Sequence, residues 1–462
     1  MPSPRPALGA LLVSVSVSVS VGTALGALLL ACGGRAQDDA DSGAVDAGVV
    51  LHHLEAGADA GPADAPDEYS SQAPHCARAA DAGSPVPFDA GADATPGVTA
   101  LAQVTNLGGP TMKLPTFVSV TFPDDTSADE LDDFVASVGC TDYWRTIGAD
   151  YGVGDGVAGP PVRLAEQAPA SIDDTGIRAW LTKKIDGGDP LFPRPAADTI
   201  YVLWYPDTTS ITLQGITSCQ AFLGYHEGGQ LADGTPFSYA VVPRCGSGGG
   251  LSGTAELTVS ASHELIEACT NPQPDAPQPA YALPDTNHMA WILANASEVG
   301  DLCEFDDSSY YQPSGFPWTV QRIWSNRAAW AGNDPCVPSP TPDYFYAAPV
   351  AADTMSINLT GTPQDVAAVH VAVGASATVP VLIVGSASTG AVHVQAIDAA
   401  QLTGQKSHLA LALDASTGKP GDTLHLTITK NSGDPSVGAE AFVMVTSDSA
   451  GHRTLFFALT SD

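Results

Sequence analysis

The chain has 462 residues, enough for two domains and further segments, and it carries 17 basic against 51 acidic residues for a formal net charge of −34. A surface of this charge repels phosphate backbones, which excludes nucleic acid as an expected partner. The acidity names no other partner, because solubility explains it equally well.

Residues 1–32 have the pattern of an export signal. Residues 7–30 are apolar or small, and the segment ends in Leu29-Leu30-Ala31-Cys32-Gly33-Gly34. This ending resembles a bacterial lipobox, where a signal peptidase cuts before the cysteine and the Cys32 thiol is then lipidated. A plain transmembrane anchor is the alternative, since the apolar run is barely long enough to span a bilayer. We expect a lipoprotein attached to the membrane through its lipid alone, at the outer membrane or cell surface, because Gly33 replaces the aspartate that favours inner-membrane retention.

Residues 33–100 predict an acidic, disordered tether. Alanine, aspartate, glycine and proline dominate this segment, and large apolar residues are too few to offset the entropy of ordering it. Repulsion between the acidic groups favours an extended spacer between a membrane and a folded domain.

Residues 104–337 predict an α+β domain with a mixed sheet. Thr199–Pro206 is apolar on both faces, as a central strand is, and Phe237–Pro243 predicts another strand. A helix is expected to start at Ser171, and Val320–Asn326 predicts a further strand.

The most informative segment of this domain is a helix predicted from Ala255 to about Thr270. Within it His263 and Glu267 are four residues apart and therefore share one face, and Glu264 stands between them. A zincin-type helix offers two metal ligands with this spacing, and its intervening glutamate acts on a bound water. Here a glutamate replaces the usual second histidine. A solvated helix face with the same spacing is the structural alternative.

A third ligand is expected from Glu298 or Asp301, which are three residues apart, so that either both point inward or only one does. One imidazole and two carboxylates form a catalytic type of zinc site with a position open for water, and manganese or iron also fits this set. Glu264 would then be the general base. His226 and His288 are candidates for supporting hydrogen bonds or for stabilising a transition state.

The cysteines indicate an exported, disulfide-bonded fold. Seven cysteines remain when Cys32 is set aside, so at least one is unpaired, and Cys76 in the expected tether is the simplest choice. No Cys-x-x-Cys spacing points to zinc thiolates instead. The predicted pairs are Cys219–Cys245, Cys303–Cys336 and Cys140–Cys269.

Residues 345–462 follow a proline-rich boundary and predict a second domain. Short, alternating, β-branched segments separated by turn signals favour an all-β sandwich of immunoglobulin-like size, without the cysteine pair of that fold. No catalytic cluster occurs here, so presentation or binding is its expected role.

Three segments together resemble a known family: His263–Pro272, which reads HELIEACTNP, then Trp291, then Glu298–Cys303, which reads EVGDLC. This pattern is similar to that of the Exordium-like (phosphate-induced protein) family and its bacterial relatives, over about residues 104–337. Weaker echoes are Gly224-Tyr-His226 and the segment that begins at Gln321. The resemblance implies that a glutamate in place of the second histidine is a family trait.

Two functions follow as hypotheses. The first is an exported, lipid-anchored, metal-dependent hydrolase, a zinc metallopeptidase-like protein with a peptide substrate. The alternative is a non-catalytic cell-surface protein of the Exordium-like kind, which binds extracellular or cell-wall polymer and holds a structural metal or none. A third, weaker hypothesis is an adhesin that acts through its C-terminal sandwich.

Overall fold

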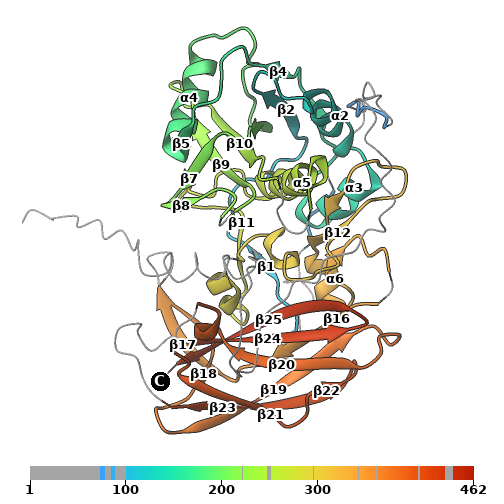
Figure 1. The fold of residues 1–462 in the computed structure, drawn as a ribbon, viewed down its shortest axis with the longest axis vertical. Helices are drawn as coiled ribbons and strands as arrows, with labels where there is room; N and C mark the ends of the chain where they lie inside the picture. Colours follow the sequence, from blue (N-terminus) through green and yellow to red (C-terminus); the bar gives the residue numbers. More distant parts are fainter. Residues whose placement is uncertain are drawn as a thin grey trace, which may run out of the picture.

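The structure is a computed structural model, and it describes ten stretches of the chain: residues 73–78, 85–88, 100–220, 222–246, 251–294, 296–341, 343–358, 363–403, 406–431 and 441–461. The expected export signal and lipobox, with Cys32, lie outside these residues. No helix within the described stretches is long and apolar enough to cross a membrane. The architecture is mixed α+β, with strands in the majority (Figure 1).

The first domain is built on one mixed sheet. Its strands are β2 (Thr116–Thr121), β3 (Val157–Ala158), β4 (Val162–Arg163), β6 (Thr199–Tyr205), β9 (Tyr225–Gln230) and β10 (Pro236–Pro243). The order is β3-β2-β6-β10-β9, with β4 also paired to β2. All pairings are parallel except that of β9 with β10, so an antiparallel strand ends the sheet. Every residue of β6 is buried, which confirms its prediction as a central strand.

Helices cover both faces of this sheet. Successive side chains of a strand point to opposite faces, so apolar side chains on both faces need a packing partner. Val202 and Val242 pack in a core with α2 (Ala128–Val138), α3 (Asp142–Gly148) and α5 (Thr254–Thr270). Tyr201 and Val241, their chain neighbours, pack on the other face against α4 (Asp174–Asp186). The predicted helix α5 is therefore confirmed, and it is buried from Glu256 to Thr270.

Two predictions of secondary structure are wrong in detail. The helix expected from Ser171 begins at Asp174, because residues 171–173 form strand β5, which pairs with β7, and the Asp173 side chain caps the helix. The strand expected at Val320–Asn326 is broken at Arg322. Its two halves pair with different partners, β12 and β15. The remaining short elements are β1 (Val104–Asn106), β5 (Ser171–Asp173), β7 (Ser210–Leu213), β8 (Ile216–Thr217), β11 (Tyr281–Pro284), β12 (Tyr310–Tyr311), β13 (Val320–Gln321), β14 (Ile323–Trp324), β15 (Cys336–Val337), α6 (Asn326–Trp330), and the 3₁₀ turns η2 (Ala149–Tyr151), η3 (Met289–Ala294), η4 (Asp301–Cys303) and η5 (Ala399–Thr403).

The C-terminal region forms two β-sheets that share a core of buried valine, leucine and isoleucine side chains. One sheet has the order β16 (Phe345–Pro349), β19 (Ser376–Gly385), β23 (Thr423–Lys430), β21 (Leu409–Leu413). The other has the order β17 (Asp353–Asn358), β18 (Pro363–His370), β25 (His452–Ser461), β24 (Ala441–Ser449), β20 (Val392–Asp398), β22 (Thr417–Gly418).

An aromatic cluster joins the two domains. The fully buried ring of Trp291, from the first domain, meets Phe456 and Phe457 of β25 edge-on, at 5.1 Å between ring centroids in each case. Phe305 packs edge-on against Phe457 at 5.2 Å. The chain between Trp291 and Phe305 is therefore held at both ends against the C-terminal sheets.

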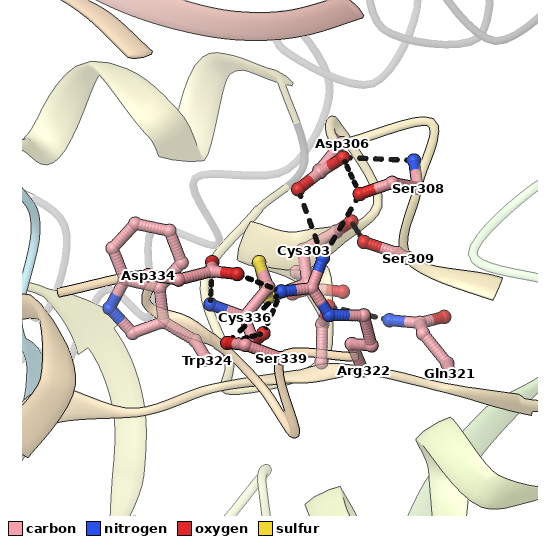
Figure 2. The surroundings of a disulfide bond; sticks show 12 residues. Cys303, Asp306, Ser308, Ser309, Gln321, Arg322, Trp324, Asp334, Cys336 and Ser339 are labelled. Atoms are coloured by element: carbon pink, nitrogen blue, oxygen red, sulfur yellow. Dashed lines mark hydrogen bonds and ion pairs between the residues drawn. A yellow bond between two sulfur atoms is a disulfide. The ribbon is translucent and has the colours of Figure 1, made fainter. Parts of the chain in front are cut away.

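The disulfides confirm two predicted pairs and correct the third. Cys219–Cys245 and Cys303–Cys336 form as expected. Beside the second pair, the buried guanidinium of Arg322 lies between the carboxylates of Asp306 and Asp334 (Figure 2).

The predicted Cys140–Cys269 pair is wrong. Cys140 is bonded to Cys76, with 5.5 Å between the Cα atoms, and Cys269 is a free, buried thiol on α5. The physical reason is that residues 73–78 lie against α2, where the Cys76 amide donates to the carbonyl of Ala136. The tether prediction therefore fails for residues 73–78, and it also fails for residues 85–88, which hydrogen-bond to η2.

Peptide mapping of the oxidised protein tests this pairing. We expect a Cys76–Cys140 cross-linked peptide, and a Cys269 thiol that alkylates only after unfolding, because α5 buries it and burial raises its pKa. A Cys140–Cys269 peptide would contradict the structure.

The aromatic cluster predicts coupled unfolding of the two domains. Phe457→Ala should lower the free energy of unfolding by about 3–5 kcal/mol, since it empties a buried site that touches both domains. Urea denaturation measures this loss. Val373→Ala, at an exposed apolar position of the same domain, is the control and should change stability by less than about 0.5 kcal/mol. Independent unfolding of the first domain, unchanged by Phe457→Ala, would rule out the coupling.

Candidate metal centre

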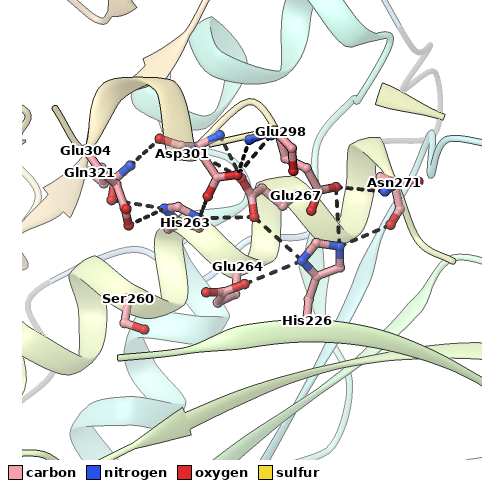
Figure 3. Close-up of polar contacts among 12 residues, drawn as sticks. His226, Ser260, His263, Glu264, Glu267, Asn271, Glu298, Asp301, Glu304 and Gln321 are labelled. Carbon is pink, nitrogen blue, oxygen red and sulfur yellow. Dashed lines mark hydrogen bonds and ion pairs between the residues drawn. The ribbon is translucent and has the colours of Figure 1, made fainter. Parts of the chain in front are cut away.

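The candidate site lies where α5 faces strand β9 and the loop that leads into η4 (Figure 3). The helix contributes His263, Glu264 and Glu267, and all three are buried. The solvated-face alternative for these residues is therefore wrong. His226 enters from β9, and the loop brings its own acidic side chains to the same place.

His263 forms the first ligand set. Its Nε2 atom lies 3.0 Å from Oε2 of Glu267 and 3.5 Å from Oδ1 of Asp301. These three side chains offer one ligand atom each within a space that could hold a metal ion. They are three of the four predicted ligands.

His226 forms a second set on the other side of Glu267. Its Nδ1 atom lies 3.4 Å from Oε2 of Glu264 and 3.6 Å from the same Glu267 Oε2 atom. These three also offer ligand atoms within metal-binding range of one another. We expected His226 only to support the ligands, but its position is equivalent to that of His263.

Glu298 and Asp301 both point inward, but toward different histidines. Asp301 faces His263, whereas Oε1 of Glu298 lies 3.8 Å from Nε2 of His226 and accepts a 2.7 Å hydrogen bond from the Asn271 amide. The second oxygen of Asp301 accepts backbone N–H groups at the start of its own turn, at 2.8 and 2.9 Å. The loop conformation thus fixes the direction of the Asp301 carboxylate.

Gly300 permits the loop to approach the helix. A Cβ atom at this position would lie 2.8 Å from the His263 ring and 2.9 Å from Oε1 of Glu267. The Gly300 amide instead donates a 2.9 Å hydrogen bond to that oxygen. Only glycine fits between the two elements, which gives the glycine of the Glu298–Cys303 segment a physical reason.

The protonation equilibria reflect a buried, strongly anionic site. Burial disfavours the charged imidazolium of His226, but Glu298, Glu264 and Glu267 outweigh burial and raise its pKa to about 10. The same balance raises the pKa of His263. Burial raises the pKa of Glu267 and of Glu298. The site therefore holds positive charge tightly, as protons when no metal is bound.

Two nearby residues escaped the sequence reasoning. Gln321 lies with its Oε1 atom 3.1 Å from Nδ1 of His263, and its amide nitrogen donates to the carbonyl of Gly300. Glu304 lies 3.5 Å from the same Nδ1 atom. The weak family resemblance of the segment that begins at Gln321 was the only feature of the sequence that pointed to Gln321. His288 makes its contacts elsewhere, with Asp285 and the Phe456 ring.

A small pocket gives access to the His226 side of the site. Its volume is about 230 Å³, and Leu107, Pro279 and Leu283 supply apolar walls. Asn271 and Glu298 form part of its lining. Both residues face His226, Glu298 with its carboxylate and Asn271 with its backbone carbonyl.

Comparison with known proteins adds little to this geometry. No family model and no curated protein matches the chain. Five chains of solved structures match, among them one from the crystal structure of a mutant complex of titin M10 with an immunoglobulin domain of obscurin-like 1. It is 16% identical, the match covers 20% of this chain and 82% of that chain, and the TM-score is 0.13. A likeness this low carries no argument, so the family resemblance stays a prediction.

The donor chemistry of the site fits a transition metal. Imidazole with carboxylates suits zinc, manganese and iron. A metal ion that binds to His263 and its carboxylate partners would also replace the protons that now offset the charge of these carboxylates.

Substitution of His263 tests metal binding. His263→Ala should lower zinc affinity at least about 10-fold, because it removes the nitrogen that faces both Glu267 and Asp301. Equilibrium dialysis followed by metal analysis measures the bound zinc. His288→Ala is the matched control, since His288 is equally buried and also paired with an aspartate. A metal-free wild-type protein, or equal losses in both variants, would contradict the assignment.

Proposed function

We propose that this protein is an exported, lipid-anchored, metal-dependent hydrolase, a zinc metallopeptidase-like protein related to the Exordium-like family. The observation that carries the proposal is the convergence of His263, Glu267 and Asp301 at one end of a buried helix. A purely structural role would leave this cluster of buried acidic side chains unexplained, since burying charge without a partner is costly.

The edge of the neighbouring sheet supports the proposal of a zincin-like domain that acts on a peptide. Strand β9 is antiparallel and ends the sheet order, so one of its sides faces no further strand of the described sheet. An extended peptide can add to such an edge through backbone hydrogen bonds. His226 lies on this strand and would bring the bound backbone close to the metal ligands.

A metal ion held by His263, Glu267 and Asp301 would supply Lewis-acid chemistry, which polarises a carbonyl and makes water more acidic. Glu264 would accept the proton of the attacking water and pass it to the leaving amine, as a general base and then a general acid. The contact with Nδ1 of His226 fixes the direction of the Glu264 carboxylate. Gln321 orients His263 through the nitrogen opposite the ligand nitrogen.

The proposed address is the outer membrane or cell surface, reached through lipidation of Cys32. Three disulfides in the described part of the chain fit an oxidising compartment outside the cytosol. The two-sheet architecture of the C-terminal region supports an immunoglobulin-like sandwich, which would present the hydrolase domain or bind extracellular polymer.

Glu264→Gln tests the catalytic role. The variant should lose at least about 100-fold in kcat on a broad peptide library while zinc stays bound at His263 and its partners, because an amide cannot take a proton from water. Glu256→Gln provides the matched control, as the same substitution on the same helix, and should leave turnover unchanged.

Bound zinc without turnover in the wild-type protein would refute the hydrolase. It would leave the alternative, a non-catalytic surface protein that binds cell-wall or extracellular polymer around a structural metal.

A further inference from the structure

The acidic site contains two histidines, and they do not belong to one ligand set. One set is His263, Glu267 and Asp301, and the other is His226, Glu264 and Glu267. Glu267 is the only member that they share, and its Oε2 atom faces both imidazoles, at 3.0 and 3.6 Å (Figure 3).

The opposite nitrogen of each imidazole is held by an oxygen that can only accept. Nε2 of His226 lies 3.2 Å from the backbone carbonyl of Asn271, and Nδ1 of His263 lies 3.1 Å from Oε1 of Gln321. The amide nitrogen of Gln321 donates to a carbonyl, which fixes which end of this side chain faces His263. Both outer nitrogens therefore carry the hydrogen.

In the neutral imidazoles this tautomer directs both inner lone pairs at Oε2 of Glu267. A lone pair that faces a carboxylate oxygen is repelled unless a cation lies between the two atoms. Because His226 and His263 approach Glu267 within different ligand sets, each approach needs its own proton or, when the imidazoles are neutral, its own metal ion.

The charge count also points to two divalent ions. Four carboxylates, those of Glu264, Glu267, Glu298 and Asp301, have side chains only 4–18% exposed. In the described part of the chain, their ion-pair partners at the site are the two histidines. When these four are ionised, one divalent ion offsets half of their negative charge and two ions offset all of it. Glu304, which is 45% exposed and lies 3.5 Å from Nδ1 of His263, adds a fifth carboxylate at the edge of the site.

We propose that this chain binds two divalent transition-metal ions, bridged by Glu267. One ion takes His263 and Asp301, and the other takes His226 and Glu264, whose second oxygen stays available for the proton of bound water. The inference rests on the proposed metal-dependent function and extends it to a two-metal site. Paired metal ions of this kind occur in hydrolases that act on peptide bonds, including aminopeptidases.

Metal stoichiometry tests the second ion. The full chain is dialysed against Mn²⁺, then analysed for bound metal and for exchange coupling between Mn²⁺ ions by electron paramagnetic resonance. The wild-type protein should bind two ions per chain and show a coupled pair. His226→Ala and His263→Ala should each retain one ion and show an uncoupled spectrum, and His288→Ala should match the wild type.

The outcomes separate this inference from the proposed function. One ion in the wild type, retained by His226→Ala, overturns the second site and leaves the single-metal hydrolase standing. One ion that either histidine variant removes also overturns it, in favour of a single ion bound by both imidazoles. No bound ion, either here or after dialysis against zinc, overturns both proposals. The wild-type stoichiometry and spectrum decide the matter even if a variant fails to fold.

Discussion

The site depends on the contacts that the carboxylate of Glu267 makes. One of its oxygens accepts the Gly300 amide, which joins α5 to the loop, and the other faces the two imidazoles. A buried carboxylate is tolerated only when such partners replace its hydration. The same side chain thus stabilises the junction of helix and loop and organises the ligands. The free-energy cost of burying an unpaired charge therefore constrains both the packing of the loop on α5 and the arrangement of the candidate ligands.

The loop that supplies half of the acidic groups is fixed from outside the first domain. Trp291 precedes it and Phe305 follows it, and both rings pack against Phe457 of the C-terminal sheets. The Cys303–Cys336 disulfide and the buried Arg322 hold its end from another direction. The C-terminal sheets therefore help to hold in place the loop that carries Glu298 and Asp301.

Local patterns predicted what depends on local geometry. The four-residue spacing of His263 and Glu267 follows from helix periodicity, and the packing of α5 confirms that they share a face. The equal standing of His226 depends on the antiparallel pairing of β9, which no local pattern specifies. Composition misled the prediction for Cys76, because the residues around it resemble a linker although they pack on α2. The aromatic cluster between the domains joins residues far apart in the chain, and a pattern search along the sequence cannot find such contacts.

The Cys76–Cys140 bond also changes how far the protein can reach. If Cys32 carries the lipid, the chain between the lipid and the first disulfide ends at Cys76 and not near residue 100. Its covalent length is then at most about 150 Å, from roughly 3.4 Å for each of about 44 residues. A pull on that anchor would enter the fold beside α2, through the bond between Cys76 and Cys140.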